Sequence, residues 1–192
     1  IMLEQLDDNL PDPGRLVGIH FFNPVAQMPL VEIVGGEASS EDALQKAIAF
    51  ARRIDKLPLP CKSAPGFLVN RVLVPYLYEA MFALQDGIPM EVIDEAALRY
   101  GMPMGPVELA DVVGLDVCRH VGDIVSKALN KQTPDTSRLD ALIAAKKLGR
   151  KSGEGFYVWR DGKAVKSGAP AAEPPADLEE RLVLALANEC AA

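Results

Sequence analysis

The pattern that most limits the fold lies in the first third of the chain, where one helical stretch separates two apolar strand-like runs. Leu30–Val34 and Leu57–Cys61 predict strands, and the prolines of the second suit an edge of a sheet. Between them, a helix start at Ser39 precedes apolar residues at helical spacing as far as about Ile54. A strand, a helix and a strand in this order form a βαβ unit, which predicts a partly parallel sheet.

Upstream of this unit, the chain offers little additional sheet. Leu16–Phe22 predicts one leading strand, and Leu3–Leu10 predicts a short acidic helix that ends at the turn cluster Pro11–Gly14. One βαβ unit with one leading strand is too small for a complete doubly wound sheet. We therefore expect residues 1–64 to be a truncated α/β domain.

From Pro65 onwards the pattern becomes helical. Phe67–Gln85 is apolar on nearly every side, as in a helix buried in a core, and Pro75 is expected to kink or split it. The later predicted elements are helices over 90–100, 106–113, 116–129 (capped by Asp116) and 138–148 (closed by Gly149), a hairpin over 156–165, an Ala/Pro-rich linker over 167–177 and a helix over 178–192.

Charge and cysteine content narrow the class of protein. The chain has 192 residues, a formal net charge of -7 and 49% hydrophobic residues. An acidic chain is a poor partner for nucleic acid or for an anionic membrane surface. No apolar run approaches the ~20 residues of a membrane span. Three widely spaced cysteines form no metal-ligand pattern, so we expect reduced thiols, no metal and a cytoplasmic location.

One histidine and one glutamate stand out as candidate catalytic residues. His20 ends an apolar run, and Glu32 is the single carboxylate in the middle of the next. An imidazole and a carboxylate on neighbouring strands can form an acid/base dyad, in which the carboxylate orients the ring and the ring moves the proton. The alternative is a hydrogen-bonded pair with a purely structural role.

Six further segments stand out along the chain, and they are Gly18–Pro24, Met28–Val34, Ala64–Arg71, Met102–Pro106, Asp111–Asp116 and Gly153–Tyr157. In this order they resemble the 3-hydroxyacyl-CoA dehydrogenase family, in particular the dehydrogenase portion of the α subunit of bacterial fatty-acid oxidation complexes. The resemblance implies an NAD-dependent oxidoreductase that converts 3-hydroxyacyl-CoA to 3-ketoacyl-CoA in β-oxidation. It also implies an α/β remnant, the end of a Rossmann-type domain, followed by a mainly α-helical domain.

The resemblance also implies roles for four residues. His20 matches the catalytic histidine, which takes the proton from the 3-hydroxyl, and Glu32 matches its paired glutamate. Asn70 matches the asparagine that lines the reacting end of the substrate, and Asn23 has a supporting role beside the dyad. For Asn70 the alternative is a polar residue that satisfies neighbouring backbone.

The sequence also departs from the family. It contains no GxGxxG turn between a strand and a helix, so its cofactor-binding residues are unknown, and the serine that the family has upstream of the histidine is absent. The chain starts at Ile1 and stops within a helical pattern, which suggests a piece of a longer protein. We expect the piece alone to bind NAD poorly and to be inactive.

The resemblance predicts four segments. They are the end of the NAD-binding domain over 1–64, the helical dehydrogenase C-terminal domain over 65–165, a linker over 166–177 and the truncated start of a second helical domain over 178–192.

Four other features have weaker claims to a functional role. His120 lies on an amphipathic helix without an evident partner, and Cys61 lies in an apolar strand. The segment Gly101–Pro106 is better explained by helix ends than by a ligand loop. The basic run Lys146–Lys151 could meet a CoA phosphate, but a helix C-terminus favours such charges in any case.

A second class of function is a helical module for assembly. The apolar stretch Phe67–Leu84 supports it, because exposed apolar helices tend to self-associate. We therefore expect a homodimer through the helical domain, and a partner from a β-oxidation complex is a further possibility.

Overall fold

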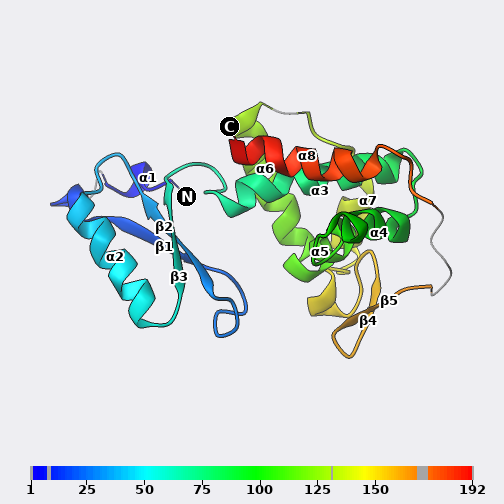
Figure 1. Cartoon of the computed structure of the whole chain (residues 1–192), viewed down its shortest axis with the longest axis horizontal. Helices are drawn as coiled ribbons and strands as arrows, with labels where there is room; N and C mark the ends of the chain where they lie inside the picture. The colour runs from blue at the N-terminus through cyan, green and yellow to red at the C-terminus, as the bar shows by residue number, and fades with distance from the viewer. Residues whose placement is uncertain (1, 8–9, 131, 168–172, 192) are drawn as a thin grey trace. The chain divides into compact units, whose positions relative to one another are not determined.

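The computed structural model describes residues 2–7, 10–130, 132–167 and 173–191 (Figure 1). Their contacts divide the chain into two compact units, Ile1–Val69 and Asn70–Ala192. The first is an α/β unit and the second is mainly helical, as the sequence predicts.

The first unit is built on a three-stranded sheet in the order β1-β2-β3. Strands β2 (Leu30–Gly35) and β3 (Leu57–Lys62) are parallel and are connected by helix α2 (Glu41–Arg53), which confirms the predicted βαβ unit. Strand β1 (Val17–Phe21) runs antiparallel to β2. Helix α1 covers only Glu4–Asp7, whereas the sequence predicted a helix over 3–10, of which residues 8–9 lie outside the described part.

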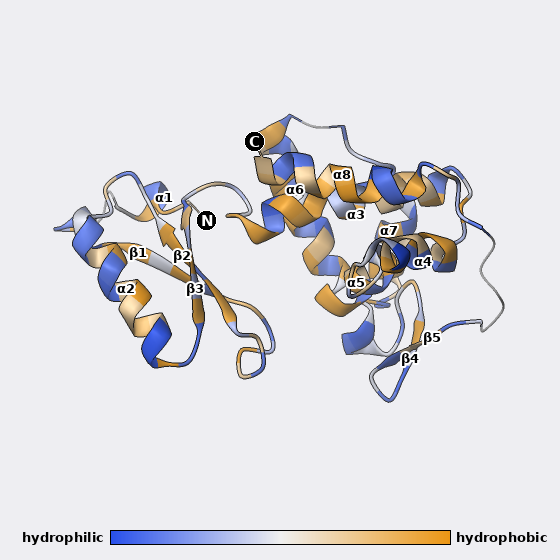
Figure 2. Cartoon of the chain, viewed as in Figure 1, coloured by the Kyte–Doolittle hydropathy of each residue, from blue (hydrophilic) through white to orange (hydrophobic). Residues whose placement is uncertain are grey.

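Helix α2 covers the sheet with its apolar side. The Ser40 hydroxyl accepts a hydrogen bond from the Ala43 N–H at 3.2 Å and caps the helix, as Ser does at helix starts. Figure 2 shows polar residues at both ends of α2 and apolar residues in its middle turns. The apolar side meets the buried side chains of β2, and the core of this unit consists of Val31, Ile33, Ala47, Ile48 and Ala51. Burial of these residues is the main stabilising contribution to the unit.

The second unit contains most of the predicted helices. They are α3 (Val69–Gln85), α4 (Met90–Tyr100), α5 (Pro106–Val113), α6 (Leu115–Leu129), α7 (Ser137–Ala144) and α8 (Leu178–Ala191), with the hairpin β4 (Val158–Arg160) and β5 (Lys163–Val165). Pro75 does not split α3, because the buried residues Val74 and Tyr76 on either side hold this turn in the core.

Two details of the helix boundaries differ from the sequence-based expectation. Helix α7 ends at Ala144 rather than at residue 148, since Lys146 takes a left-handed conformation with a φ of 59°. Asp116 does not cap α6. It lies in the first turn of that helix and pairs with Lys151 at 2.5 Å, while Gly114, with a φ of 103°, precedes the helix.

A buried carboxylate ties the hairpin region to helix α5. Asp111 is fully buried and accepts hydrogen bonds from the backbone N–H groups of Phe156 and Tyr157, both at 2.9 Å, and from Trp159 Nε1 at 3.0 Å. A Cβ atom at Gly155 would overlap the Asp111 carboxylate, so the close approach requires glycine there. The three donors replace water around a charge that would otherwise be costly to bury.

A second buried carboxylate, Asp94 on α4, holds the start of helix α5. It accepts hydrogen bonds from the N–H of Val107 at 2.8 Å, the N–H of Glu108 at 3.1 Å and the hydroxyl of Tyr157 at 2.8 Å. The carboxylate thus caps a helix that begins after Gly105, where a Cβ would overlap Asp94. Desolvation is the main reason that the pKa of Asp94 rises to about 6.

This raised pKa predicts a dependence of stability on pH. The folded chain holds the Asp94 proton more tightly than the unfolded chain does, so the free energy of unfolding falls as the pH rises through the interval between the two pKa values. Relative to Asp94→Asn, which stays neutral, the wild type should lose about 3 kcal/mol of stability between about pH 3 and pH 7. Urea unfolding of both proteins across this range measures the difference, and parallel stability curves would contradict the prediction.

Helix α8 completes the core of the second unit. Leu178 and Leu182 have no exposed surface and belong to the same apolar cluster as Tyr76, Ile93 and Tyr157. The assignment of residues 178–192 to a second helical domain stays a prediction, but in this chain α8 packs against α4 within one compact unit. None of the helices in the described part combines the length and the apolarity that a bilayer crossing needs.

Candidate active site

The two residues predicted to form a dyad face each other across the antiparallel strands β1 and β2. His20 and Glu32 are direct partners in the strand register. The ring nitrogen Nδ1 lies 2.8 Å from Glu32 Oε2. Because the ionised carboxylate is only an acceptor, the ring donates from Nδ1–H, which fixes the tautomer of the neutral ring. The strand register thus produces the arrangement that an acid/base pair needs.

Glu32 is held from a second direction by the start of helix α3. Its side chain is fully buried, and Oε1 accepts hydrogen bonds from the N–H groups of Leu68 at 2.9 Å and Val69 at 2.8 Å. These N–H groups at a helix start favour a negative charge. The two oxygens therefore have separate partners, and the carboxylate cannot turn away from His20 without losing hydrogen bonds.

The histidine ring is fixed by two phenylalanines. Its centroid lies 4.8 Å from the Phe22 ring, in an edge-on arrangement, and 5.5 Å from the Phe67 ring. The His20 side chain keeps 34% of its surface exposed. Since Nδ1 is engaged by Glu32, Nε2 is the nitrogen that can exchange a proton with a bound molecule. Glu32 therefore orients the ring through Nδ1, and Nε2 stays available to a bound molecule.

Sequence reasoning predicted that His20 and Glu32 pair with each other, but it missed part of the support of this pair. Leu68 and Val69 contribute backbone groups, which leave no signature in their side chains. Phe67 has a φ of 49°, an uncommon conformation for a non-glycine residue, and follows Gly66 with a φ of 81°. The adjacent Pro65-Gly66 turn signal is the only sequence hint of this unusual backbone.

The two asparagines differ in their surroundings. Asn23 is exposed in the segment after β1 and precedes Pro24 through a cis peptide bond. Asn70 is half-buried near the start of α3 and begins the second compact unit.

The remaining candidates show ordinary structural surroundings. Burial raises the pKa of the Cys61 thiol to about 11, with a further contribution from the charge of Glu32, so a thiolate nucleophile is disfavoured. His120 is exposed on α6. Within the basic run, Lys147 pairs with Glu154 and Lys151 pairs with Asp116, both at 2.5 Å. Protein carboxylates thus balance two charges of the basic run, so these two lysines need no anionic ligand.

The glycine-rich stretches do not fit a dinucleotide site. Gly105 lies against Asp94, and Gly149 and Gly155 lie against Asp111, where an added Cβ would overlap protein atoms. These glycines therefore serve close packing inside the helical unit, whereas a phosphate cradle needs backbone N–H groups that face a ligand at a helix start. In the part of the chain that the structure describes, these glycines do not form the pyrophosphate turn of an NAD site.

Two family models together match most of the chain. The model "3-hydroxyacyl-CoA dehydrogenase, NAD binding domain" matches residues 1–64, and the model "3-hydroxyacyl-CoA dehydrogenase, C-terminal domain" matches residues 66–159. The two ranges meet close to the predicted boundary at residues 64–65.

Curated relatives agree with the models. A fatty acid oxidation complex subunit alpha from Pseudomonas savastanoi pv. phaseolicola is 42% identical over 176 residues, which cover 89% of this chain and 24% of the relative. The corresponding subunit of Pseudomonas putida is 41% identical over 168 residues, or 86% of this chain and 24% of the relative. The chain thus spans about a quarter of the length of these relatives.

Solved structures show the same similarity in three dimensions. FadB2 of M. tuberculosis has a TM-score of 0.77 and 34% identity, over 83% of this chain and 57% of that one. The 3-hydroxybutyryl-CoA dehydrogenase of Escherichia coli K12 has a TM-score of 0.76 and 38% identity, over 90% of this chain and 38% of that one. With two matching domain models and these relatives, the chain belongs to the 3-hydroxyacyl-CoA dehydrogenase family.

Proposed function

We propose that this chain supplies the proton-transfer machinery of an NAD-dependent 3-hydroxyacyl-CoA dehydrogenase of fatty-acid β-oxidation. The observation that carries the proposal is the buried Glu32 carboxylate, which holds His20 by Nδ1 while Leu68 and Val69 hold the carboxylate. Such an oriented imidazole suits the removal of a proton from an alcohol near neutral pH. Membership of the family and similarity to the alpha subunits support the choice of substrate.

In this mechanism, His20 Nε2 accepts the proton of the substrate 3-hydroxyl as the C3 carbon becomes a carbonyl. Glu32 stays ionised, keeps Nδ1 protonated and stabilises the imidazolium that forms. In the reverse direction the same ring returns the proton to the oxygen. NAD, when bound, would accept the hydride that leaves C3.

Asn70 has the right chemistry to assist at the reacting oxygen. Its amide can donate to a carbonyl or alkoxide oxygen without bringing a charge. It directly follows Val69, whose N–H group is fixed by Glu32, so the start of α3 is tied to the dyad through the backbone. We propose a substrate-binding role for Asn70 and a supporting role beside the dyad for Asn23.

Replacing Asn70 with Ala tests this role. We expect kcat to fall about 10²-fold, the typical effect of removing one donor to a developing oxyanion. Asn188→Ala, which removes an exposed amide on α8, is the matched control and should leave kcat unchanged. Steady-state kinetics with acetoacetyl-CoA measure both variants. Equal kcat values for the wild type and Asn70→Ala would show that Asn70 does not assist at the reacting oxygen.

The activity itself is tested in a protein that also contains a dinucleotide-binding half. Two suitable proteins are a longer natural polypeptide that includes this sequence and a chimera with the corresponding half of a family member. We expect oxidation of NADH that depends on acetoacetyl-CoA. A folded protein of this type with no such oxidation would contradict the proposed function. The sequence-based expectation that the 192-residue chain alone is inactive is tested in the same assay.

An assembly role is the second candidate function, and an apolar stripe on α6 favours it. Val117 and Ile124 are 43% and 42% exposed, although they lie two turns apart on the same side of the helix. Exposed apolar residues in a row are typical of contact surfaces. We propose this stripe as the surface of the predicted homodimer. A β-oxidation complex partner and a cytoplasmic location stay predictions.

A further inference from the structure

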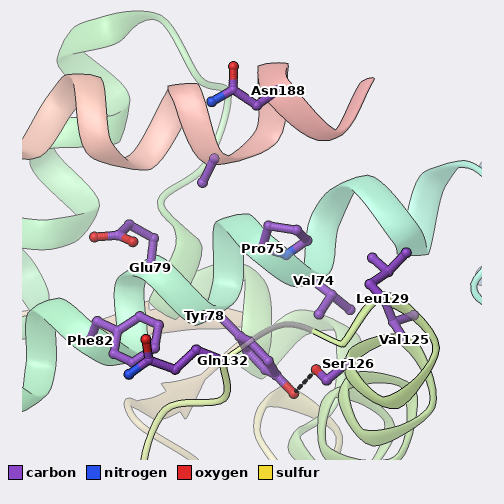
Figure 3. A pocket seen from close by; sticks show the side chains of 11 residues that line it. Val74, Pro75, Tyr78, Glu79, Phe82, Val125, Ser126, Leu129, Gln132 and Asn188 are labelled. Carbon is purple, nitrogen blue, oxygen red and sulfur yellow. Dashed lines mark hydrogen bonds between the residues drawn. The ribbon is translucent and has the colours of Figure 1, made fainter. Parts of the chain in front are cut away.

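A cavity between α3, α6 and α8 of the helical unit contains polar groups that pair with other protein groups. Its volume is about 310 Å³. Figure 3 shows Tyr78 directed at Ser126, whose hydroxyl lies 2.9 Å from the Tyr78 hydroxyl. Glu79, which also lines the cavity, pairs with Arg181 at 2.7 Å. These polar groups need no ligand, whereas a lysine of the α/β unit makes contacts that point to a role in the reaction.

The loop between β1 and β2 comes directly after the strand that carries His20. Residues 23–29 are all exposed, so buried side chains do not hold this loop in place. Its own hydrogen bonds form a turn, in which the N–H groups of Gln27 and Met28 donate to the Pro24 carbonyl at 2.9 and 3.0 Å. These bonds shape the loop but do not attach it to the sheet.

Lys56 attaches this loop to the rest of the α/β unit. Its ammonium group donates to the backbone carbonyls of Val25 at 2.6 Å and of Met28 at 2.9 Å. Between residues that the structure describes, no other side chain forms a hydrogen bond with residues 23–29. Hydrogen bonds from a charged donor are stronger than neutral ones. Lys56 is therefore the main side-chain attachment of the loop.

The backbone around Lys56 brings its side chain to this end of the sheet. Asp55 follows α2 in the left-handed conformation, with a φ of 57°, and the Lys56 N–H donates to the Ala51 carbonyl at 3.0 Å. The next residue, Leu57, begins β3 and is the register partner of Leu30, which begins β2. Lys56 thus lies where the chain leaves α2 and where the loop enters β2.

The other end of the loop adjoins the imidazole of the dyad. The Phe22 ring centroid lies 4.8 Å from that of His20, and Asn23 follows Phe22 in the sequence. A displaced loop would therefore move Phe22 away from the imidazole and would also move Asn23. The bond from His20 to Glu32 connects paired strands and does not involve the loop. The loop can thus affect the surroundings of the ring without changing its tautomer.

We infer that Lys56 is a positioning residue for the dehydrogenase reaction. Its ammonium group holds two carbonyls of the loop, and the held loop keeps Phe22 against the His20 ring and fixes Asn23 next to it. The effect on the reaction rate rests on the proposed function, whereas the effect on the loop is measured without any activity.

The variant Lys56→Met tests the hold on the loop in this chain. Methionine has an unbranched side chain of similar length but no N–H donor. We expect the amides of Gln27 and Met28 to exchange with solvent at least about tenfold faster, because their turn loses its attachment. NMR measures this exchange. Tm should change little, since the loop buries no side chain.

The effect on the reaction is measured in a protein that also contains a dinucleotide-binding half. There, Lys56→Met should lower kcat with acetoacetyl-CoA at least about tenfold, because small displacements of positioning groups have large effects on rate. The pH dependence of kcat should keep its midpoint, since the bond from His20 to Glu32 is intact. Lys56→Arg keeps a charged donor with several N–H groups and should recover most of the lost rate.

An exposed lysine on α2 provides the matched control. Lys46 forms an ion pair with Asp42 in which both side chains are 75% exposed. Lys46→Met should therefore change neither the amide exchange of the loop nor kcat.

Several results would overturn the inference. Unchanged exchange at Gln27 and Met28 would show that Lys56 does not hold the loop. Faster exchange with an unchanged kcat would show that the held loop does not serve the reaction. A shifted pH midpoint would mean that the charge of Lys56 acts on the ring directly, and an unfolded Lys56→Met would mean that the lysine holds the whole unit. An inactive wild type would instead contradict the proposed function, and the exchange experiment would still show whether Lys56 holds the loop.

Discussion

Replacing His20 with Gln is expected to slow acetoacetyl-CoA-dependent NADH oxidation by about 10³-fold or more in a protein that contains this chain and a dinucleotide-binding half. General acid/base catalysis alone is typically worth ~10²–10⁴ in rate. Glutamine can still donate a hydrogen bond to Glu32, so the strands should stay paired, but it cannot accept and release a proton near neutral pH. The effect should therefore fall on kcat with little change in stability.

The second histidine provides the control for this experiment. His120 is exposed on α6, and His120→Gln should have the wild-type rate. Circular dichroism and Tm would confirm that both variants are folded. If His20→Gln were folded and fully active, the dyad would be structural, and the assembly role would become the better account of the chain.

Replacing Asp111 with Ala is expected to destabilise the helical unit by at least about 3 kcal/mol. The substitution leaves the N–H groups of Phe156 and Tyr157 and the indole N–H of Trp159 without their acceptor in the core. Each unsatisfied buried donor costs about 1–3 kcal/mol. In a chain of this size the change corresponds to a Tm lower by about 6 °C or more. Urea unfolding monitored by Trp159 fluorescence measures it directly.

Asp116→Ala is the matched comparison for this substitution. Asp116 is an acidic residue on the neighbouring helix, and its side chain forms an exposed ion pair with Lys151. Exposed pairs contribute about 0–1 kcal/mol, so this variant should stay close to the wild type. Similar small losses for Asp111→Ala and Asp116→Ala would show that the buried hydrogen bonds of Asp111 do not hold the hairpin region.

Local patterns in the sequence were sufficient to predict most of the elements. The bounds of α4 and α5 agree with prediction, because Gly101 ends one helix in the left-handed conformation and Pro106 begins the next. The end of α7 was predicted wrongly because lysines near a helix C-terminus also favour longer helices. Here the hydrogen bond from Leu148 N–H to Ser152 Oγ, at 2.7 Å, stabilises a turn instead.

Contacts between residues far apart in the sequence were harder to predict. The antiparallel register that places His20 opposite Glu32 depends on a loop whose conformation does not follow from periodicity. The roles of Asp94 and Asp111 were not foreseen, since an acidic residue in an amphipathic helix normally faces solvent.

The most direct test of the central claim is the protonation of the His20 ring, measured by 15N NMR in this chain and in Glu32→Gln. For the neutral ring, we predict a protonated Nδ1 that is hydrogen-bonded to Glu32 and an unprotonated Nε2 that is available to a substrate hydroxyl. The preference should weaken in Glu32→Gln. A neutral ring protonated at Nε2 in the wild type would contradict the assignment of His20 as the base.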